Sequence, residues 1–271
     1  MAHAQKRWTD AIIRPVKKTL FGDPDYDGGR SQAQESDVAE LGQILADVCA
    51  LGWADWRSYA FAREPLVGRI SSEQQKELME QARICGELWA ARLTEKFGTA
   101  DPQELARALG ATVSFAEKPH SQDRVLFAEF TEPNEIYVYT DALDKAKALL
   151  QDASVRAELG ENFSPEQVLI AHEVYHLVEL SFPDEVWTHT YRFDLRIGPI
   201  KNPSKLAVLE EIAAMSFARA LTHIRFSPYV LDIFLTYAYS PEAGTMLYRE
   251  VMGYQNKSAA DVAAKDTKDE E

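Results

Sequence analysis

The 271-residue sequence is poor in cysteine and lacks an apolar run of about eighteen residues, the length needed to cross a bilayer. Its two cysteines, Cys49 and Cys85, have no CxxC spacing, so we expect both to be reduced core residues. The first residues, MAHAQKRWTDAIIRPVKK, contain no apolar stretch long enough for a signal peptide. We therefore expect a cytoplasmic protein that does not insert into membranes.

Basic residues are also scarce. Lys and Arg number 29 against 43 Asp and Glu, which gives a formal net charge of −14. Because affinity for phosphate backbones depends on clustered Lys and Arg, this balance argues against direct binding of nucleic acid. The hydrophobic content of 46% is enough for a sizeable core, and the length suits one domain with additions or two small domains.

The first hundred residues have mainly helical patterns. Residues 1–34 mix charge with Gly and Pro and show no sustained period, which indicates an arm or loop. Apolar positions in 38–49 follow helical spacing, and a capping box of Ser72 and Gln75 predicts the start of another helix. We assign 1–98 to an N-terminal arm and helical region.

A second unit is predicted over 99–255. Asp101 is typical of a helix N-cap in DPQELARALG. The runs ATVSF, VLFAEF and EIYVYT predict three short strands, the last two joined as a hairpin across TEPN. Later helix starts are predicted where Pro follows Ser or Asn, at Ser164-Pro165, Asn202-Pro203, Ser227-Pro228 and Ser240-Pro241.

These elements predict an α+β fold in which a small sheet lies beside two long helices. The tail, 256–271, is charged and has few large apolar residues, so we predict that it is disordered. The oligomeric state does not follow from any of these patterns.

The motif His172-Glu173-Val174-Tyr175-His176 carries the chemistry. Residues four apart lie on one helix face, so two imidazoles can share one metal ion while the intervening Glu173 reaches water. The surrounding segment, QVLIAHEVYHLVEL, is otherwise apolar. The alternative, an ordinary helix with two polar residues, would bury both histidines without an evident partner, and such burial is costly. The pattern therefore favours a metal site.

A catalytic zinc ion usually takes three protein ligands, so a third residue is required. The candidates are Glu211, Glu210, Glu179 and His189. Glu211 shares its helix face with alanines only, which permits close approach to the HExxH helix, whereas Glu210 lies on a bulkier face that includes Phe217. The sequence favours Glu211 and leaves Glu210 as the main alternative.

At these motifs the sequence resembles the ImmA/IrrE family of zinc metallopeptidases, within the broader gluzincins. The resemblance covers about residues 100–222, in DPQELARALGATV, EIYVYT, QVLIAHEVYHLV and EEIAAMSFARAL. The family motif E-x-x-A-N-x-F-A is matched at Glu211, Ala214, Phe217 and Ala218. Met215 stands where the family usually has Asn, and the following Met-Pro is absent. The resemblance implies a zincin-like domain, Glu211 as third ligand, and a helix-turn-helix repressor as substrate.

We expect hydrolysis of a peptide bond in a protein or peptide substrate, with Glu173 as general base. The expected ligands of zinc, or of another divalent ion, are His172, His176 and Glu211. Candidate donors to the oxyanion are His189, Tyr191 and Tyr175. Two alternatives stay open: a non-catalytic zincin-fold module that binds a regulatory partner, and an aminopeptidase acting on small peptides.

Overall fold

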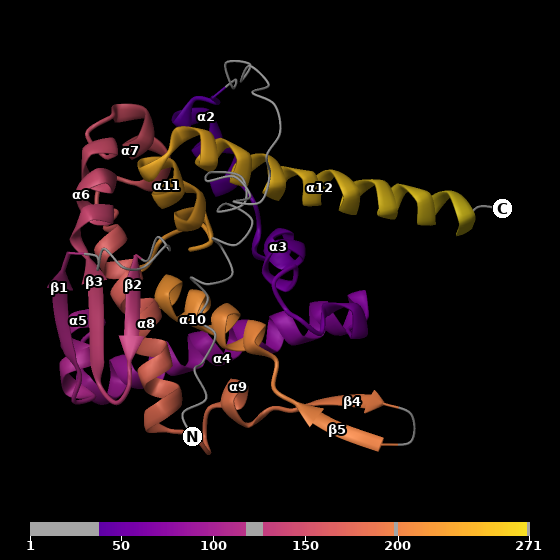
Figure 1. The fold of residues 1–271 in the computed structure, drawn as a ribbon, viewed down its shortest axis with the longest axis horizontal. Coiled ribbons are helices and arrows are strands. Elements are labelled where there is room, and N and C mark those ends of the chain that lie inside the picture. The colour runs from indigo at the N-terminus through magenta and orange to yellow at the C-terminus, as the bar shows by residue number, and fades with distance from the viewer. Residues whose placement is uncertain (1–37, 118–126, 198–199, 270–271) are drawn as a thin grey trace, which may run out of the picture.

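The computed structural model of the protein describes residues 38–117, 127–197 and 200–269. The arm predicted over 1–34 lies outside the described residues. Helices form most of the described chain, together with one three-stranded sheet and one β-hairpin (Figure 1). The architecture is thus α+β, as the sequence predicted.

The N-terminal part of the described chain is helical. Its elements are α2 (Leu41–Cys49), η1 (Trp53–Trp56), α3 (Arg57–Phe61), η2 (Val67–Arg69), α4 (Ser72–Phe97) and α5 (Pro102–Ala108). The N-cap of α4 is Ser71, whose hydroxyl accepts from the Gln74 amide at 3.2 Å while the Gln74 side chain accepts from the Ser71 amide at 2.9 Å. The capping box predicted at Ser72 and Gln75 was wrong by one residue, because two overlapping Ser-to-Gln pairs have the same spacing.

The three-stranded sheet consists of β1 (Thr112–Ala116), β2 (Ala128–Thr131) and β3 (Glu135–Tyr139) in the order β1-β3-β2. β3 pairs with β2 in antiparallel register and with β1 in parallel register. The hairpin predicted across TEPN is therefore confirmed. Within the described residues β2 is an edge strand, and α8 (Pro165–Ser181) packs against it (Figure 1).

Helix α8 begins as the sequence predicted. Ser164 is its N-cap and accepts from the Gln167 amide at 3.3 Å, and Pro165 occupies the first helical position, where its missing N–H costs nothing. Twelve of its residues are buried, among them His172 and the carboxylates Glu173 and Glu179, while His176 is only partly buried. The other buried residues are Pro165, Val168, Leu169, Ile170, Ala171, Val174, Tyr175, Leu177 and Val178.

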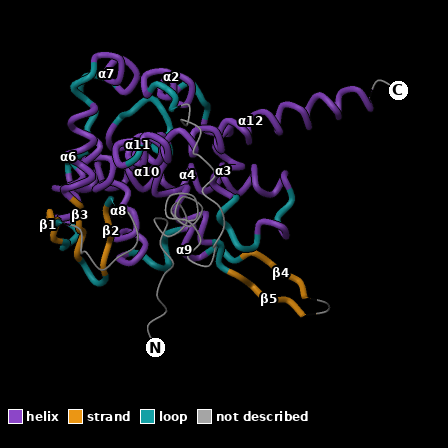
Figure 2. Tube along the Cα trace, turned by 45° about the horizontal axis from the view of Figure 1, so that its top comes forward, coloured by secondary structure: helices purple, strands orange, loops and turns teal. Residues whose placement is uncertain are grey.

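Helix α10 (Ala207–Thr222) packs between α4 and α8 in the centre of the molecule (Figures 1 and 2). Gly86 of α4 lies against it so closely that an added Cβ would come within 2.2 Å of the Ala213 carbonyl oxygen. A Cβ at position 86 would therefore force the two helices apart. Residues of α4 and α10 belong to one hydrophobic core cluster, which crosses the boundary predicted between 98 and 99.

The remaining elements are α6 (Thr140–Leu149), α7 (Ala153–Leu159), α9 (Trp187–Thr190), β4 (Phe193–Ile197), β5 (Ile200–Ser204), α11 (Val230–Tyr239) and α12 (Pro241–Asp269). Strands β4 and β5 form an antiparallel hairpin that projects from the body of the fold (Figures 1 and 2). The helix start predicted at Asn202-Pro203 was wrong, because these residues lie in β5, where a two-stranded ribbon has open edges that tolerate proline.

Helix α12 begins at Pro241, as predicted after Ser240, while α11 begins two residues beyond the Ser227-Pro228 pair. The α12 backbone stays helical over 256–269, where the sequence predicted disorder. Its alanines and lysines have high helix propensity, which acts without core contacts.

No helix in the described part of the chain has the length and apolar composition needed to cross a membrane. Both cysteines are free.

Asp232 in α11 is a completely buried carboxylate. The Tyr59 hydroxyl donates to its Oδ2 at 2.7 Å, and its Oδ1 has no hydrogen-bond partner among the described residues. Burial raises the pKa of Asp232 to about 8, although the Tyr59 hydrogen bond and the Arg63 charge act in the opposite direction. The carboxyl group is therefore mostly protonated in the folded protein at neutral pH.

We expect Asp232→Asn to gain stability relative to wild type as the pH is raised. The folded-state pKa lies above the ordinary value, so this residue's contribution to wild-type stability is fully present in acid and is lost as the pH rises through about 8. The amide does not titrate. Thermal unfolding between about pH 6 and about pH 9 should therefore show the Tm difference moving in favour of the variant by several degrees. Asp144→Asn, at an exposed carboxylate, is the control; a pH-independent Tm difference would contradict the expectation.

Candidate metal centre

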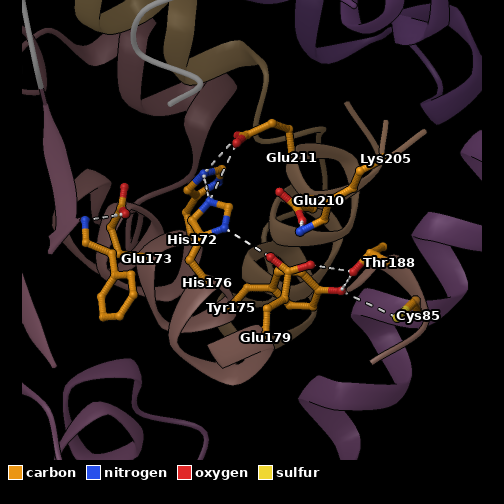
Figure 3. A network of polar contacts seen from close by, with 11 residues as sticks. Cys85, His172, Glu173, Tyr175, His176, Glu179, Thr188, Lys205, Glu210 and Glu211 are labelled. Atoms are coloured by element: carbon orange, nitrogen blue, oxygen red, sulfur yellow. Dashed lines mark hydrogen bonds and ion pairs between the residues drawn. The ribbon is translucent and has the colours of Figure 1, made fainter. Parts of the chain in front are cut away.

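Three side chains from α8 and α10 converge in the interior of the protein (Figure 3). His172 Nε2 lies 3.3 Å from His176 Nε2 and 3.3 Å from Glu211 Oε2, and His176 Nε2 lies 3.7 Å from Glu211 Oε1. One donor atom from each residue can be chosen so that all lie within 4.8 Å of one another. The structure therefore brings together the three residues that the sequence proposed as ligands, and this group could hold a metal ion.

The donor set and its spacing fit a tetrahedral zinc ion. At zinc bond lengths near 2.1 Å, the ligand atoms of a tetrahedral site lie about 3.4 Å apart, close to the separations observed here. Two imidazole nitrogens and one carboxylate are a common protein ligand set for catalytic zinc. The same donors accept other divalent ions, so geometry alone does not select zinc among them.

Burial and mutual charge shift the pKa values of all three residues. Burial, followed by the neighbouring charge of His176, lowers the pKa of His172 to about 4. At His176 burial acts in the same direction, but the Glu179 hydrogen bond and the charge of Glu211 overcome it and raise the pKa to about 10. Burial raises the pKa of Glu211 to about 7. The group therefore binds protons at neutral pH, and a divalent cation would displace them.

Glu173 lies beside this group without belonging to it. As the sequence neighbour of His172 it projects about 100° away around the helix axis. Its Oε2 accepts a hydrogen bond from the backbone amide of Phe130 in β2 at 2.7 Å (Figure 3). The carboxylate is 8% exposed. Glu173 is thus held by the edge strand of the sheet and not by α10.

The other ligand candidates have different partners. Glu210 forms an ion pair with Lys205. Glu179 Oε2 lies 3.4 Å from His176 Nδ1, the ring nitrogen opposite the one that faces Glu211. His189 lies in α9, and burial together with the positive charge of Lys205 lowers its pKa. Among the described residues, the group that could hold an ion does not include any of the three.

Of the candidate oxyanion donors, Tyr175 points away from the ligand group. Its hydroxyl lies 2.8 Å from Thr188 Oγ1 and 3.4 Å from Cys85 Sγ, and its ring packs against Phe217 of α10 (Figure 3). Tyr191 packs its ring against Trp187, with 4.9 Å between ring centroids. No sequence pattern predicts the contacts of Thr188 and Cys85 with Tyr175, because only the tertiary fold brings these segments together.

No family model, curated protein or solved structure matches this chain. The resemblance to ImmA/IrrE metallopeptidases accordingly stays a prediction. Function must be inferred from the side chains of the site, where the candidate ligands His172, His176 and Glu211 come together and the carboxylates of Glu173 and Glu179 lie nearby.

Proposed function

We propose that the protein is a zinc-dependent metallopeptidase that hydrolyses a peptide bond in a protein substrate. The observation that carries the proposal is that the candidate metal ligands and the candidate general base are different residues with different partners. His172, His176 and Glu211 offer three donor atoms to one ion, while Glu173 on the same helix is held outside that set by the edge strand. An HExxH helix, a third ligand from another helix and an adjacent small sheet together support a zincin-like domain.

In the proposed reaction each residue of the site has a separate role. Zinc, when bound by His172, His176 and Glu211, polarises a scissile carbonyl group and lowers the pKa of water. Glu173 accepts the proton of the attacking water and passes it to the leaving amine. The amide of Phe130 fixes the orientation of the Glu173 carboxylate by the hydrogen bond to Oε2, leaving Oε1 for the proton transfer.

The outer edge of β2, which no strand of the described residues pairs with, supports a peptide as substrate. The Phe130 amide is directed to Glu173 and therefore away from β3. In an antiparallel strand, the N–H and C=O of one residue point to the same side, so the Phe130 carbonyl also faces the outer edge. An extended peptide can pair with such an edge, here through the Phe130 carbonyl while the Phe130 amide stays with Glu173, and it would then lie next to the general base. By resemblance, the proposed substrate is a helix-turn-helix repressor.

The proposal is tested by incubating the purified protein with an unfolded protein and following peptide-bond cleavage by mass spectrometry. We expect internal cleavage by the zinc-loaded protein, loss of cleavage after chelation, and recovery when zinc is restored. Release of single N-terminal residues would favour an aminopeptidase. Metal binding without cleavage of either the unfolded protein or a co-expressed repressor would favour a non-catalytic binding module. Circular dichroism of the chelated protein controls for unfolding.

A further inference from the structure

His176 has two ring nitrogens in different surroundings. Its Nε2 faces the ligand group, 3.3 Å from His172 Nε2 and 3.7 Å from Glu211 Oε1, while its Nδ1 lies 3.4 Å from Glu179 Oε2 (Figure 3). A neutral imidazole carries one proton, so a nitrogen that binds a cation requires the proton to sit on the other. Glu179 is placed to accept that proton's hydrogen bond and to hold the ring in this tautomer.

Glu179 is itself held from a second element. Its carboxylate is 4% exposed, and the Thr188 hydroxyl of α9 donates to its Oε1 at 2.5 Å. The two carboxylate oxygens thus have separate partners, His176 on one side and Thr188 on the other. A carboxylate with both oxygens engaged has little rotational freedom, so the direction in which it presents Oε2 to His176 is set by α9.

The hydrogen atoms of this cluster can be assigned one by one. Thr188 has a single hydroxyl proton and uses it on Glu179, so in its 2.8 Å contact with Tyr175 the threonine oxygen must accept. Tyr175 is then the donor, and its one proton is used. In the 3.4 Å contact between Tyr175 and Cys85 the tyrosine oxygen must therefore accept from the thiol. Every donor along the cluster points the same way, from Cys85 toward Glu179.

We propose that Glu179 is the positioning residue of His176, and that Thr188, Tyr175 and Cys85 form a one-directional chain of buried donors that fixes Glu179. The chain joins α4, α8 and α9, so it ties the N-terminal helical region to a metal ligand. When a cation binds Nε2, the chain keeps the remaining His176 proton on Nδ1, hydrogen-bonded to Glu179. The proposal rests on His176 being a metal ligand, as in the proposed function, but not on catalysis.

The experiment measures zinc affinity of the purified full chain by competition with a chromophoric chelator. Thr188→Val removes the donor to Glu179 with little change in volume, and Glu179→Gln places an amide N–H against one of its two donors. We expect each to weaken zinc binding by about 10- to 100-fold, the usual cost of losing an outer hydrogen-bond partner of a metal ligand. Thr188→Ser keeps the hydroxyl and should bind zinc as the wild type does.

A matched control is Thr245→Val in α12, which makes the same change at a buried threonine whose Oγ1 accepts from the Ala39 amide at 3.2 Å. Zinc affinity should not change in this variant.

In the zinc-loaded wild type, ¹⁵N NMR should show a His176 Nδ1–H proton that exchanges slowly with water, and in Thr188→Val the exchange should be faster. A loss of packing alone would weaken folding without this spectroscopic change.

The outcomes separate the positioning chain from the proposed function. Zinc bound with wild-type affinity by either folded variant, Thr188→Val or Glu179→Gln, would overturn the positioning chain and leave the peptidase proposal intact. A wild-type protein that binds zinc but cleaves no peptide bond would overturn the peptidase proposal alone. A wild-type protein that binds no zinc would overturn both.

Discussion

Glu173→Gln should keep its divalent ion and lose nearly all cleavage. Glu173 lies between the two histidines in the sequence, but its side chain leaves α8 on a different face of the helix. Its Oε2 accepts a hydrogen bond from the Phe130 amide, whereas both histidines face Glu211 of α10. Its removal therefore leaves the three ligands in place. Glutamine can still accept the Phe130 hydrogen bond but cannot take a proton from water, and loss of a general base typically costs about 10² to 10⁴ in rate.

The measurement compares metal content, by elemental analysis, with the rate of cleavage of one protein substrate in wild type and Glu173→Gln. Glu166→Gln provides a matched control, because it makes the same chemical change in the first turn of the same helix, at a residue that pairs with Lys147 at 3.7 Å. Cleavage by the control should equal that of wild type. If Glu173→Gln retains both metal and biological output, the protein is a binding module and not a peptidase.

Removal of a ligand should abolish stable metal binding. Wild type is expected to hold one divalent ion per chain, and His172→Ala or His176→Ala to hold none after dialysis, because two ligands do not retain catalytic zinc tightly. Glu211→Gln should weaken binding by more than the about 10- to 100-fold that loss of an outer partner costs. Elemental analysis that shows full occupancy in both histidine variants would contradict the site.

The neighbouring residue in α10 supplies the control for the third ligand. Glu210 is also buried, at 6% exposed, but it pairs with Lys205. Glu210→Gln therefore removes a buried charge without removing a ligand and should leave zinc affinity close to that of wild type. In chelator competition, a larger loss in Glu210→Gln than in Glu211→Gln would move the third ligand to Glu210.

The features that sequence reasoning predicted are those set by a few neighbouring residues. Ser164 caps α8 through the amide three residues on, and Asp101 caps α5 in the same way at 2.9 Å. The spacing of His172 and His176 likewise depends only on helix geometry. The choice of Glu211 as third ligand needed a tertiary argument, because it depended on which face of α10 carries residues small enough to approach α8.

The features that it missed depend on the tertiary fold. The β4–β5 hairpin places Pro203 opposite Asp194, but a Pro after Asn is equally typical of a helix start, and nothing local distinguishes the two. Cys85 and Tyr175 are 90 positions apart in the chain, so no spacing rule connects them. Cys85 is a reduced core residue, as predicted, and its thiol contacts the hydroxyl of Tyr175, which was predicted only as a candidate oxyanion donor.

The close contact at Gly86 limits which N-terminal segments can be combined with the rest of this chain. The glycine lies in the helical region before residue 98, and the Ala213 carbonyl that excludes a side chain there lies in the helix that carries Glu211. Recombination near residue 98 would therefore preserve the packing of the helix that carries Glu211 only if the incoming N-terminal segment carried a glycine in the same register.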